Sequence, residues 1–293
     1  MNRKTVSDRL FDFFNVTLFI LVLLLIMYPM YFILIASVSD PVAINAGKVW
    51  LWPVDFNWKG YETIFMERSI WMGYKNSLVY AILGAAFSTA LTISGGYALS
   101  RKDLVGRTPI MLFILFTMFF QGGLIPSYIL IKNLGMLDTI WAMVIPGAVS
   151  AFLLIITRTF FQQSIPDELL EASMMDGCNN TRFFFRIVLP LSLPIIAVIA
   201  LFNAVGQWNS YFKALIYITN EDLQPLQIIL RRILVKNQAS ELLRNVTSAQ
   251  DMVQYAELIK YGLIIVASLP MLVLYPFLQK YFVKGMMIGS VKG

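Results

Sequence analysis

The chain of 293 residues is 58% hydrophobic and only 14% charged, with a mean hydropathy of +0.70. Soluble domains average about 25% charged residues, so this composition excludes a soluble enzyme and a disordered chain. A single cysteine, Cys178, excludes an intramolecular disulfide, and the absence of histidine removes the commonest metal ligand and proton shuttle. The net charge of +6 comes from residues between apolar runs, where Lys and Arg indicate membrane topology rather than nucleic-acid binding. We therefore expect an all-α integral membrane protein.

Six uncharged runs are long enough to cross the membrane, since a helix needs about 20 apolar residues to span roughly 30 Å of hydrocarbon. The runs are too long and too uniform for barrel strands, so helices are expected. The first run exceeds the 7–15-residue core of a signal peptide, and we expect it to remain as a span. The predicted spans are Phe13–Ser39, Asn76–Ser100, Thr108–Ile131, Thr139–Thr157, Ile187–Phe212 and Tyr261–Gln279.

The distribution of basic residues predicts that both termini lie on the cytoplasmic side. Lys and Arg of short cytoplasmic loops set the orientation of membrane proteins. They concentrate in segments that share the side of the N-terminus: Arg3, Lys4, Arg9, Arg101, Lys102, Arg107, Arg158, Arg182, Arg186, Lys280, Lys284 and Lys292. On the opposite side, segment 213–260 includes an amphipathic stretch from Gln224 and is expected to be an external helical excursion. Asn76 and Ser77 are expected to mark only the beginning of the second span.

Prolines and glycines interrupt several of the predicted spans. Such residues are tolerated where neighbouring helices or a cavity satisfy the freed backbone groups. Ordinary kinked packing explains any one of them, whereas together they favour a bundle that moves. They are Pro29, Pro126, Pro146, Pro190, Pro194, Pro270, Pro276, Gly95, Gly96, Gly122 and Gly123.

The predicted cytoplasmic loop 158–190 contains a short helix with marked ends. Ser164 or its neighbour is expected to cap the helix, Pro166 suits its first turn, and Gly177 suits its end. By helical spacing, Leu170, Ser173, Met174 and Gly177 share one face. From these features alone, a docking surface for another protein and a helix lying on the membrane surface are equally good interpretations.

The motif in this loop resembles the EAA motif of binding-protein-dependent ABC transporter permeases. Glu171-Ala172-Ser173, then Gly177 after three residues, and Ile187-Val188-Leu189-Pro190 after nine more reproduce that motif, with Ser in place of its second Ala. The tail from Lys284 to Gly293 resembles the family's terminal G-x-V-K-G ending. Shorter elements, Phe120–Pro126 and Gln207-Trp208-Asn209, are similar to the branch that imports complex polysaccharides or oligosaccharides.

This resemblance implies the fold and partners of the MalG-like subunit of a type I ABC importer. The expected layout is a cytoplasmic segment 1–12, a six-helix permease domain 13–280 and a cytoplasmic tail 281–293. The expected complex contains a second homologous permease, two copies of a cytoplasmic ATPase and an extracytoplasmic solute-binding protein, in the inner (cytoplasmic) membrane of a bacterium. No Gly-x-x-x-x-Gly-Lys-[Ser/Thr] sequence is present, since Val49 follows the one Gly-Lys pair. ATP and Mg would thus be bound by the partner ATPase, and this chain is expected to hold no cofactor, metal or catalytic residue.

The resemblance also implies that loop 158–190 couples the ATPase to transport. Glu171 would be the polar anchor, the small Ala172 and Ser173 would permit close approach, and Gly177 would allow the bend. Leu170 and Met174 would add apolar contacts with the ATPase. The remaining coupling residues by the motif are Ile187, Leu189 and Pro190.

Polar and aromatic residues within the spans are candidates for the substrate path. Polar side chains inside a membrane are costly and often functional, and aromatic rings can stack on sugars. Hydrogen bonds between helices and an interfacial aromatic belt are the alternative explanation. The candidates are Gln121, Asn203, Gln207, Trp208, Asn209 and Tyr211.

We therefore expect a permease subunit of an ATP-driven importer of oligosaccharides released from complex polysaccharides. An ABC permease for a non-sugar solute is the main alternative. An ATP-independent secondary carrier is less favoured, because ion coupling usually needs carboxylates within the spans and the six runs contain none.

Overall fold

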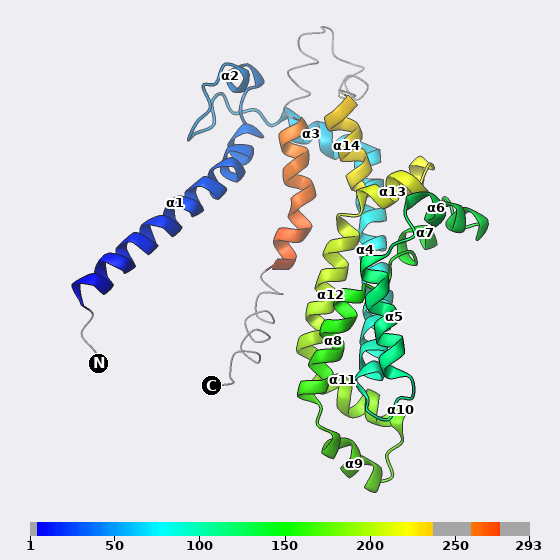
Figure 1. Cartoon of the computed structure of the whole chain (residues 1–293). Coiled ribbons are helices and arrows are strands. Elements are labelled where there is room, and N and C mark those ends of the chain that lie inside the picture. Colours follow the sequence, from blue (N-terminus) through cyan, green and yellow to red (C-terminus); the bar gives the residue numbers. More distant parts are fainter. Residues whose placement is uncertain (1–4, 237–258, 276–293) are drawn as a thin grey trace. The chain divides into compact units, whose positions relative to one another are not determined.

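The computed structural model describes residues 5–236 and 259–275, and all regular secondary structure in these ranges is helical (Figure 1). The predicted tail 281–293 and the part of the external segment that carries Glu241 and Arg244 lie outside the described residues. The chain divides into two compact units, one of residues 1–70 and 230–269, the other of 71–229 and 270–293.

Most helices of residues 5–236 are separated by connections of a few residues, and a longer one joins α2 to α3. In chain order they are α1 (Val6–Ala36), α2 (Pro41–Asn45), α3 (Lys59–Met66), α4 (Arg68–Ser100), α5 (Arg107–Phe119), α6 (Leu124–Asn133), α7 (Ile140–Val144), α8 (Ala151–Ser164), α9 (Asp167–Met175), α10 (Asn180–Phe183), the π-helical turn η1 (Phe184–Val188), α11 (Leu189–Leu191), α12 (Leu193–Trp208), α13 (Tyr211–Tyr217), the 3₁₀ turn η2 (Glu221–Leu223), α14 (Leu226–Lys236) and a helix Ile259–Tyr275.

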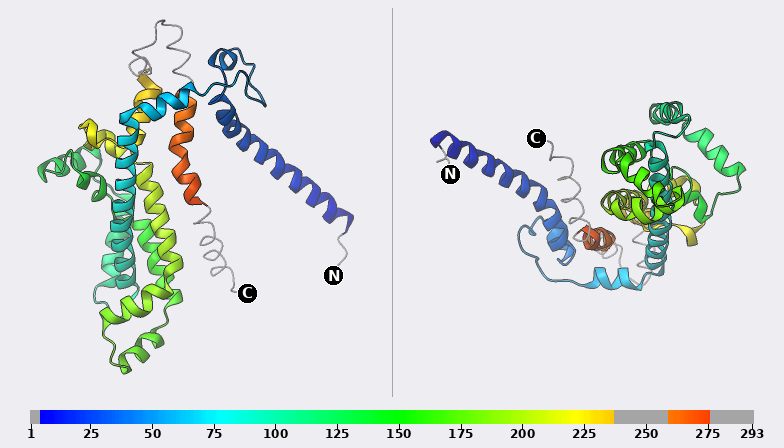
Figure 2. Two further views of the ribbon diagram at one scale, coloured as in Figure 1. Left: turned by 180° about the vertical axis from the view of Figure 1, so that it is seen from behind. Right: turned by 90° about the horizontal axis from the view of Figure 1, so that it is seen from below.

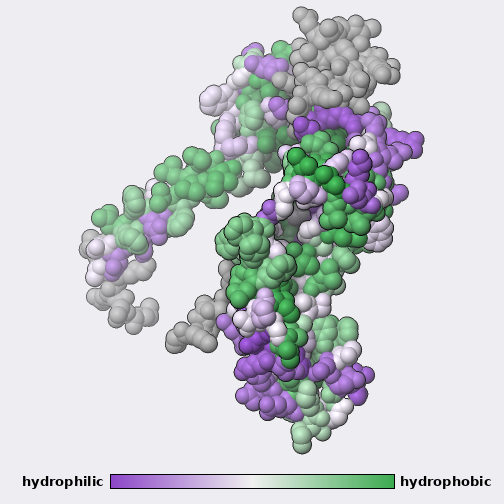
Figure 3. Space-filling model, turned by 45° about the vertical axis from the view of Figure 1, so that its right-hand side comes forward, coloured by the Kyte–Doolittle hydropathy of each residue, from purple (hydrophilic) through white to green (hydrophobic). Residues whose placement is uncertain are grey.

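Two of these helices are long and apolar enough to cross a membrane, Ser7–Ala36 within α1 and all of α4. Two bent pairs, α5 with α6 and Asn180–Leu191 with α12, raise the number to four if each pair is one span. Almost all of the α1 side chains from Leu10 to Leu34 are exposed, and hydrophobic residues cover most of this helix (Figure 3). Such a surface fits lipid rather than water.

The structure corrects the prediction of a single helix over Thr108–Ile131. This region forms two helices, α5 and α6, which meet at an angle of 113°. Between them Gly123 has a φ of +82°, a conformation that favours glycine, and Pro126 lies in the first turn of α6. The apolar run therefore continues through the bend although the helix does not.

The spans predicted over Thr139–Thr157 and Ile187–Phe212 are also interrupted. The first divides into α7 and α8 at Pro146 and Gly147, which has a φ of +71°. In the second, an 80° bend separates α11 from α12. Pro190 has no N–H to donate and its ring crowds the carbonyl four residues earlier, which accounts for the wide turn η1 and the bend that follows.

Within the second unit, α4 is approached closely by α8 and α12, and these helices run side by side (Figures 1 and 2). A Cβ on Gly96 would lie 2.6 Å from Thr157 Cγ2, and one on Gly84 would lie 2.7 Å from the Gln207 side chain. Small residues on α4 thus let the other two helices pack directly against its backbone.

Asn76 and Ser77 do more than mark the beginning of a span. They lie inside α4, where Asn76 Nδ2 donates to the carbonyls of Asp222 (2.7 Å) and Gln224 (3.0 Å). Ser77 Oγ accepts from Leu226 N at 2.9 Å. These bonds hold the segment before α14 against α4, which corrects the sequence-based interpretation.

Two charged side chains join α7 and α13. Asp138, two residues before α7, accepts from Thr219 N (2.6 Å), Thr219 Oγ1 (2.5 Å) and Asn220 N (2.8 Å). At the other end, Lys213 Nζ on α13 donates to the carbonyls of Met143 (3.1 Å) and Pro146 (2.9 Å), so it satisfies backbone groups at the end of α7. The two short helices are therefore connected at both ends.

The hydrogen bonds to Asp138 predict a pH-dependent contribution to stability. The Thr219 hydroxyl, followed by the Asn220 amide, lowers the pKa of the Asp138 carboxyl below its ordinary value. A lowered pKa stabilises the folded state above the unfolded pKa of about 3.9, and this stabilisation is lost as the pH falls through the folded pKa. Asp138→Asn should therefore melt below the wild type at pH 7, with a difference that shrinks below about pH 5.

Thermal unfolding in detergent between pH 7 and pH 3 measures this difference. Asn tolerates the φ of +55° at this position, so the substitution does not introduce backbone strain. Asp222→Asn, at an exposed carboxylate nearby, is the control and should not change the pH dependence. An Asp138→Asn deficit of equal size at every pH would contradict the electrostatic explanation.

Candidate functional site

The helix predicted in loop 158–190 is α9, and both of its ends have identifiable local causes. Asp167 and Glu168 occupy its first turn, where carboxylates complement the helix dipole. At the other end Gly177 has a φ of +73°, its N–H donates to Met174 O, and Cys178 N donates to Ser173 O. This pair of bonds is a Schellman motif, so the predicted end at Gly177 is confirmed.

The expected cap of α9 is wrong. Ser164 is the last residue of α8, and Pro166 takes the N-cap position without a side-chain hydrogen bond. The extended backbone at Pro166, with ψ at 149°, separates the two helices. Proline has no N–H to be satisfied there, and the acidic first turn accounts for the start of α9 without a hydroxyl cap.

One side of α9 packs against the chain. Ser173 is 6% exposed and its Oγ donates to Leu170 O at 2.7 Å. Leu170, with Leu169, is half-buried against a hydrophobic cluster that includes Phe161 of α8 and Phe183 of α10. Leu170 and Ser173 therefore lie on the inner side of the helix, where they position α9 on the bundle.

Apart from Ser173, the side chains from Glu171 to Met175 are exposed, and we call this surface the outer side of α9. Met174 and Met175 are 47% and 89% exposed, and Glu171 and Ala172 are exposed as well. No hydrogen bond or ion pair within the described part of the chain involves the Glu171 carboxylate. This outer side thus presents a free carboxylate and flexible apolar side chains, which suits an adaptable contact with another protein.

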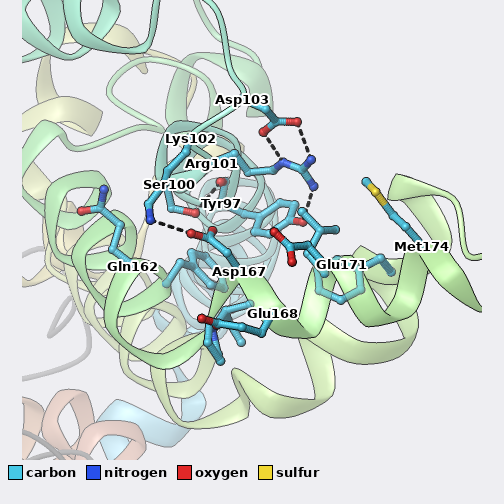
Figure 4. Close-up of a pocket in the computed structure, with 15 residues that line it drawn as sticks. Tyr97, Ser100, Arg101, Lys102, Asp103, Gln162, Asp167, Glu168, Glu171 and Met174 are labelled. Carbon is cyan, nitrogen blue, oxygen red and sulfur yellow. Dashed lines mark hydrogen bonds and ion pairs between the residues drawn. The ribbon is translucent and has the colours of Figure 1, made fainter.

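A groove of about 650 Å³ lies between α9 and the end of α4 (Figure 4). The carboxylates of Asp167, Glu168 and Glu171 line one wall and the basic residues Arg101 and Lys102 line the other. The groove is lined by Tyr97, Ser100, Arg101, Lys102, Asp103, Phe161, Gln162, Ile165, Pro166, Asp167, Glu168, Leu170, Glu171, Met174 and Phe183. Opposite charges on facing walls make this a polar site at the end of the helical bundle.

Arg101 is the central residue of the hydrogen bonds around the groove. Its guanidinium donates to both carboxylate oxygens of Asp103, at 2.7 and 2.5 Å, and to Tyr97 OH and Asn180 Oδ1, each at 3.2 Å. The bidentate bond to Asp103 raises the pKa of Arg101, and the same bond lowers the pKa of the Asp103 carboxyl. Because Asn180 begins α10, Arg101 joins the end of α4 to the segment that follows α9.

Lys102 contacts the beginning of α9. Its Nζ lies 2.6 Å from Asp167 Oδ2, and this bond raises the pKa of Lys102. Both side chains are more than half exposed, so the pair contributes little to stability. Arg101 and Lys102 thus reach both ends of the α9 segment from the same turn. From the sequence, Arg101 and Lys102 indicate only the membrane topology. No local sequence pattern predicts their bonds to Asn180 and Asp167, which lie far away in the chain.

The last residues of the motif lie apart from the outer side of α9. Ile187 in η1 and Leu189 in α11 are half-buried and pack against the cluster that contains Phe161 and Phe183. Pro190 is exposed and lies just before the bend at Ser192. Ile187 and Leu189 therefore belong to the cluster against which α9 packs.

Two candidate residues of the substrate path face α4 from α12. Asn203 Nδ2 donates to Thr89 Oγ1 at 3.3 Å, and the Gln207 side chain packs against Gly84. The Gln207 Oε1 atom is buried and has no hydrogen-bond partner within residues 5–236 and 259–275. Thr89, a residue not identified from the sequence, belongs to this polar line.

The other candidates are dispersed. Trp208 is 2% exposed and its ring packs edge-on against Tyr74, so the expected stacking on a sugar is not available to it in this conformation. Tyr211 is 43% exposed, and Asn209 is exposed at the end of α12. Gln121 is exposed in the bend between α5 and α6. Asn203 and Gln207 are thus the candidates that the structure places together.

The chain is similar along its whole length to curated transport proteins. It is 39% identical over 98% of its length to the polygalacturonan/rhamnogalacturonan transport system permease protein YtcP of Bacillus subtilis (strain 168), all of which is covered. The chain belongs to the carbohydrate ABC transporter permeases. The permease is also 37% identical to Protein LplC of the same strain, over 99% of this chain and 97% of that protein. No protein-family model matches the sequence.

A solved structure supports the same assignment. The permease matches a chain of a bacterial ABC transporter involved in the import of the acidic polysaccharide alginate, with a TM-score of 0.88 and 32% identity. The match covers 96% of this permease and 100% of that chain. The family expected from the motif in loop 158–190 is therefore confirmed, and the permease is a membrane protein.

The bonds of Arg101 predict that this residue contributes more to stability than its neighbour. Arg101→Met should destabilise the permease by about 1 kcal/mol, because it removes charged hydrogen bonds from a side chain that is only 12% exposed. Lys102→Met removes a pair exposed on both sides and should change the melting temperature little. Thermal unfolding of both variants in the same detergent measures the difference. Equal melting temperatures would contradict the structural role of Arg101.

Proposed function

We propose that this permease is a membrane-spanning subunit of an ABC importer that takes up oligosaccharides released from complex polysaccharides. The names of its relatives support the cargo, since they include transport of polygalacturonan/rhamnogalacturonan, of arabinooligosaccharides and of melibiose, raffinose and stachyose. The observation that carries the proposal is α9, with its inner side packed on the bundle and its outer side free. ATP and Mg would be bound by the partner ATPase.

The proposed topology has six spans in the bacterial cytoplasmic membrane, with both termini inside. The spans are α1, α4, the pair α5 and α6, α8, the bent pair that ends with α12, and the helix from Ile259. The basic residues of the α4–α5 turn and of the α9 segment support this orientation, because they lie together at one end of the second unit. The proposed external segment 213–260 begins within α13 and includes α14.

In the proposed complex α9 is the coupling helix that contacts one ATPase subunit. Two ATPase copies, a second homologous permease and an extracytoplasmic solute-binding protein complete the assembly. Glu171 would pair with a basic group of the ATPase, while Ala172, Met174 and Met175 would fill an apolar surface. The buried side of α9, at Leu170 and Ser173, would transmit the movement to α8 and α10. Closure of the ATPase pair would then rock the bundle between two states.

The polar line between α4 and α12 is proposed as part of the substrate path. The buried Gln207 Oε1 has no hydrogen-bond partner among the residues that the structure describes, and such an atom is costly to leave unpaired. In a state in which α4 and α12 separate, one sugar hydroxyl would donate to it and a second hydroxyl would donate to the neighbouring Asn203 amide oxygen. Tyr211, Asn209 and Gln121 would then be contacts nearer the ends of the path.

Capture of partners tests the proposed assembly. The tagged permease is purified from its own host in mild detergent, and the bound subunits are identified with their stoichiometry. Two ATPase copies and one related permease are expected, with a binding protein that retains oligosaccharides. A permease that is stable alone and binds no ATPase would contradict the coupling role of α9. A captured binding protein that retains only non-sugar solutes would exclude the proposed cargo.

Gly177 offers a sharper test of coupling because the chain contains a matched control. Gly135 ends α6 with the same two backbone bonds, from Gly135 N to Lys132 O and from Met136 N to Ile131 O, and with a similar φ of +67°. Val at either position imposes the same backbone strain, of about 1–2 kcal/mol. Only Gly177→Val should strongly reduce ATP-driven uptake per assembled complex in proteoliposomes.

The comparison is made at equal amounts of complex in the membrane. Gly135→Val controls for the loss of stability, since it lies outside the coupling segment. Equal uptake by the two variants would contradict the assignment of α9 as the coupling helix.

A further inference from the structure

The segment between α2 and α3 turns back along the side of α1 (Figures 1 and 2). Tyr31 OH donates to Leu51 O, and Tyr28 OH donates to Trp50 O at 3.5 Å. These tyrosines precede the end of α1 at Ala36 by five and eight residues. At 1.5 Å per residue, the segment therefore runs back along α1 for about 8–12 Å from the C-terminal end of the helix. We name residues 46–54 the finger.

The base of the finger is fixed at the end of α1. Asp40 N donates to Val54 O at 2.9 Å, and Val54 N donates to Ser39 Oγ at 3.3 Å. Val49 is 4% exposed and packs with Ile35 and Ala43. The finger is thus a packed element with a defined direction.

The tip of the finger presents large apolar side chains outward. Trp50, Leu51 and Trp52 are 69%, 60% and 78% exposed. The Trp50 indole N–H is already satisfied, since it donates to Gly47 O at 2.7 Å. The sequence Val49-Trp-Leu-Trp-Pro-Val54 contains no charge, whereas Lys48 and Asp55 flank it at the base. In water this arrangement would expose two indoles without any compensating contact.

The position of the tip beside α1 indicates which environment surrounds it. The tip contacts α1 at Tyr28 and Tyr31, on a candidate membrane span whose apolar side chains are exposed along its length. The surface of the tip is continuous with this lipid-facing surface. A water-soluble partner would have to reach the flank of a candidate span, where a membrane-spanning helix is expected to meet lipid. Trp and Tyr prefer the boundary between headgroups and acyl chains.

We propose that the finger is an interfacial membrane anchor, in which Trp50, Leu51 and Trp52 insert into the leaflet that meets the C-terminal end of α1. An insertion depth of about 5–10 Å is usual for such apolar faces and agrees with the descent of the finger. The anchor holds the end of α1 at a constant depth through the bonds of Tyr28 and Tyr31. Its assignment to the outer leaflet rests on the proposed topology, but the insertion itself does not.

Fluorescence quenching of the full permease in lipid vesicles tests the anchor. Three variants each retain one tryptophan, Trp50, Trp52 or Trp58, with the other tryptophans replaced by Phe. Trp58 is the matched control, because it is half exposed in the same connection but lies at the base, next to Asn57, whose N–H donates to Val38 O. Lipids brominated near the headgroup end of the acyl chain should roughly halve the emission of Trp50 and Trp52. They should affect Trp58 much less.

Quenching that is stronger from these shallow bromines than from bromines at the chain end, with protection from aqueous acrylamide, supports the proposal. Quenching by acrylamide and not by brominated lipid would overturn it, because the tip would then lie in water. Protection from both quenchers would also overturn it, since protein would then cover the tip. If the single-tryptophan variants do not fold, the comparison is made in the otherwise intact permease. There the double variant Trp50→Phe/Trp52→Phe should lose more shallow quenching than Trp58→Phe.

Discussion

The packing of α9 against Phe161 and Phe183 is the interaction on which the arrangement of the functional loop depends. The side chains of Ser173 and Leu170 point toward the helical bundle. Because successive residues on a helix are rotated by 100°, these two contacts also fix the direction of the other α9 side chains. Met175 consequently lies outward, while Glu171 and Met174 are exposed at the groove beside α4. A helix of nine residues is marginal alone, so this packing also stabilises the helix itself.

The turn after α4 adds a second constraint on the same loop. Arg101 is bonded to Asp103 within the turn and to Asn180 after α9, while Lys102 meets Asp167 at the start of α9. The loop is thus attached to α4 at both ends and to α8 and α10 through its buried side. A force applied to the outer side of α9 would therefore be distributed over several helices, as the proposed coupling role requires.

The interruptions of the apolar helices have a common physical origin. In a membrane a free backbone carbonyl or amide must find a partner within the protein, so helices end only where the local chemistry allows it. Gly123 and Gly147 adopt positive φ, and Pro190 cannot continue the regular helical hydrogen bonds. These positions turn long apolar runs into bent pairs. The polar line of Asn203 and Gln207 lies on α12, in the half of the helix that is farther from its bend.

The sequence alone determined the membrane class, the apolar runs, the short helix before Gly177 and the family, because each depends on composition or on residues close in the chain. It did not determine where the apolar runs bend, that Ser164 ends α8, or that Ser173 and Trp208 are buried. The hydrogen bonds of Arg101 to Asn180 and of Asn76 to Asp222 join residues 79 and 146 positions apart, so no local pattern encodes them. Only the tertiary structure decided which side of α9 is free and that Trp50 and Trp52 descend beside α1, because both depend on contacts between distant segments.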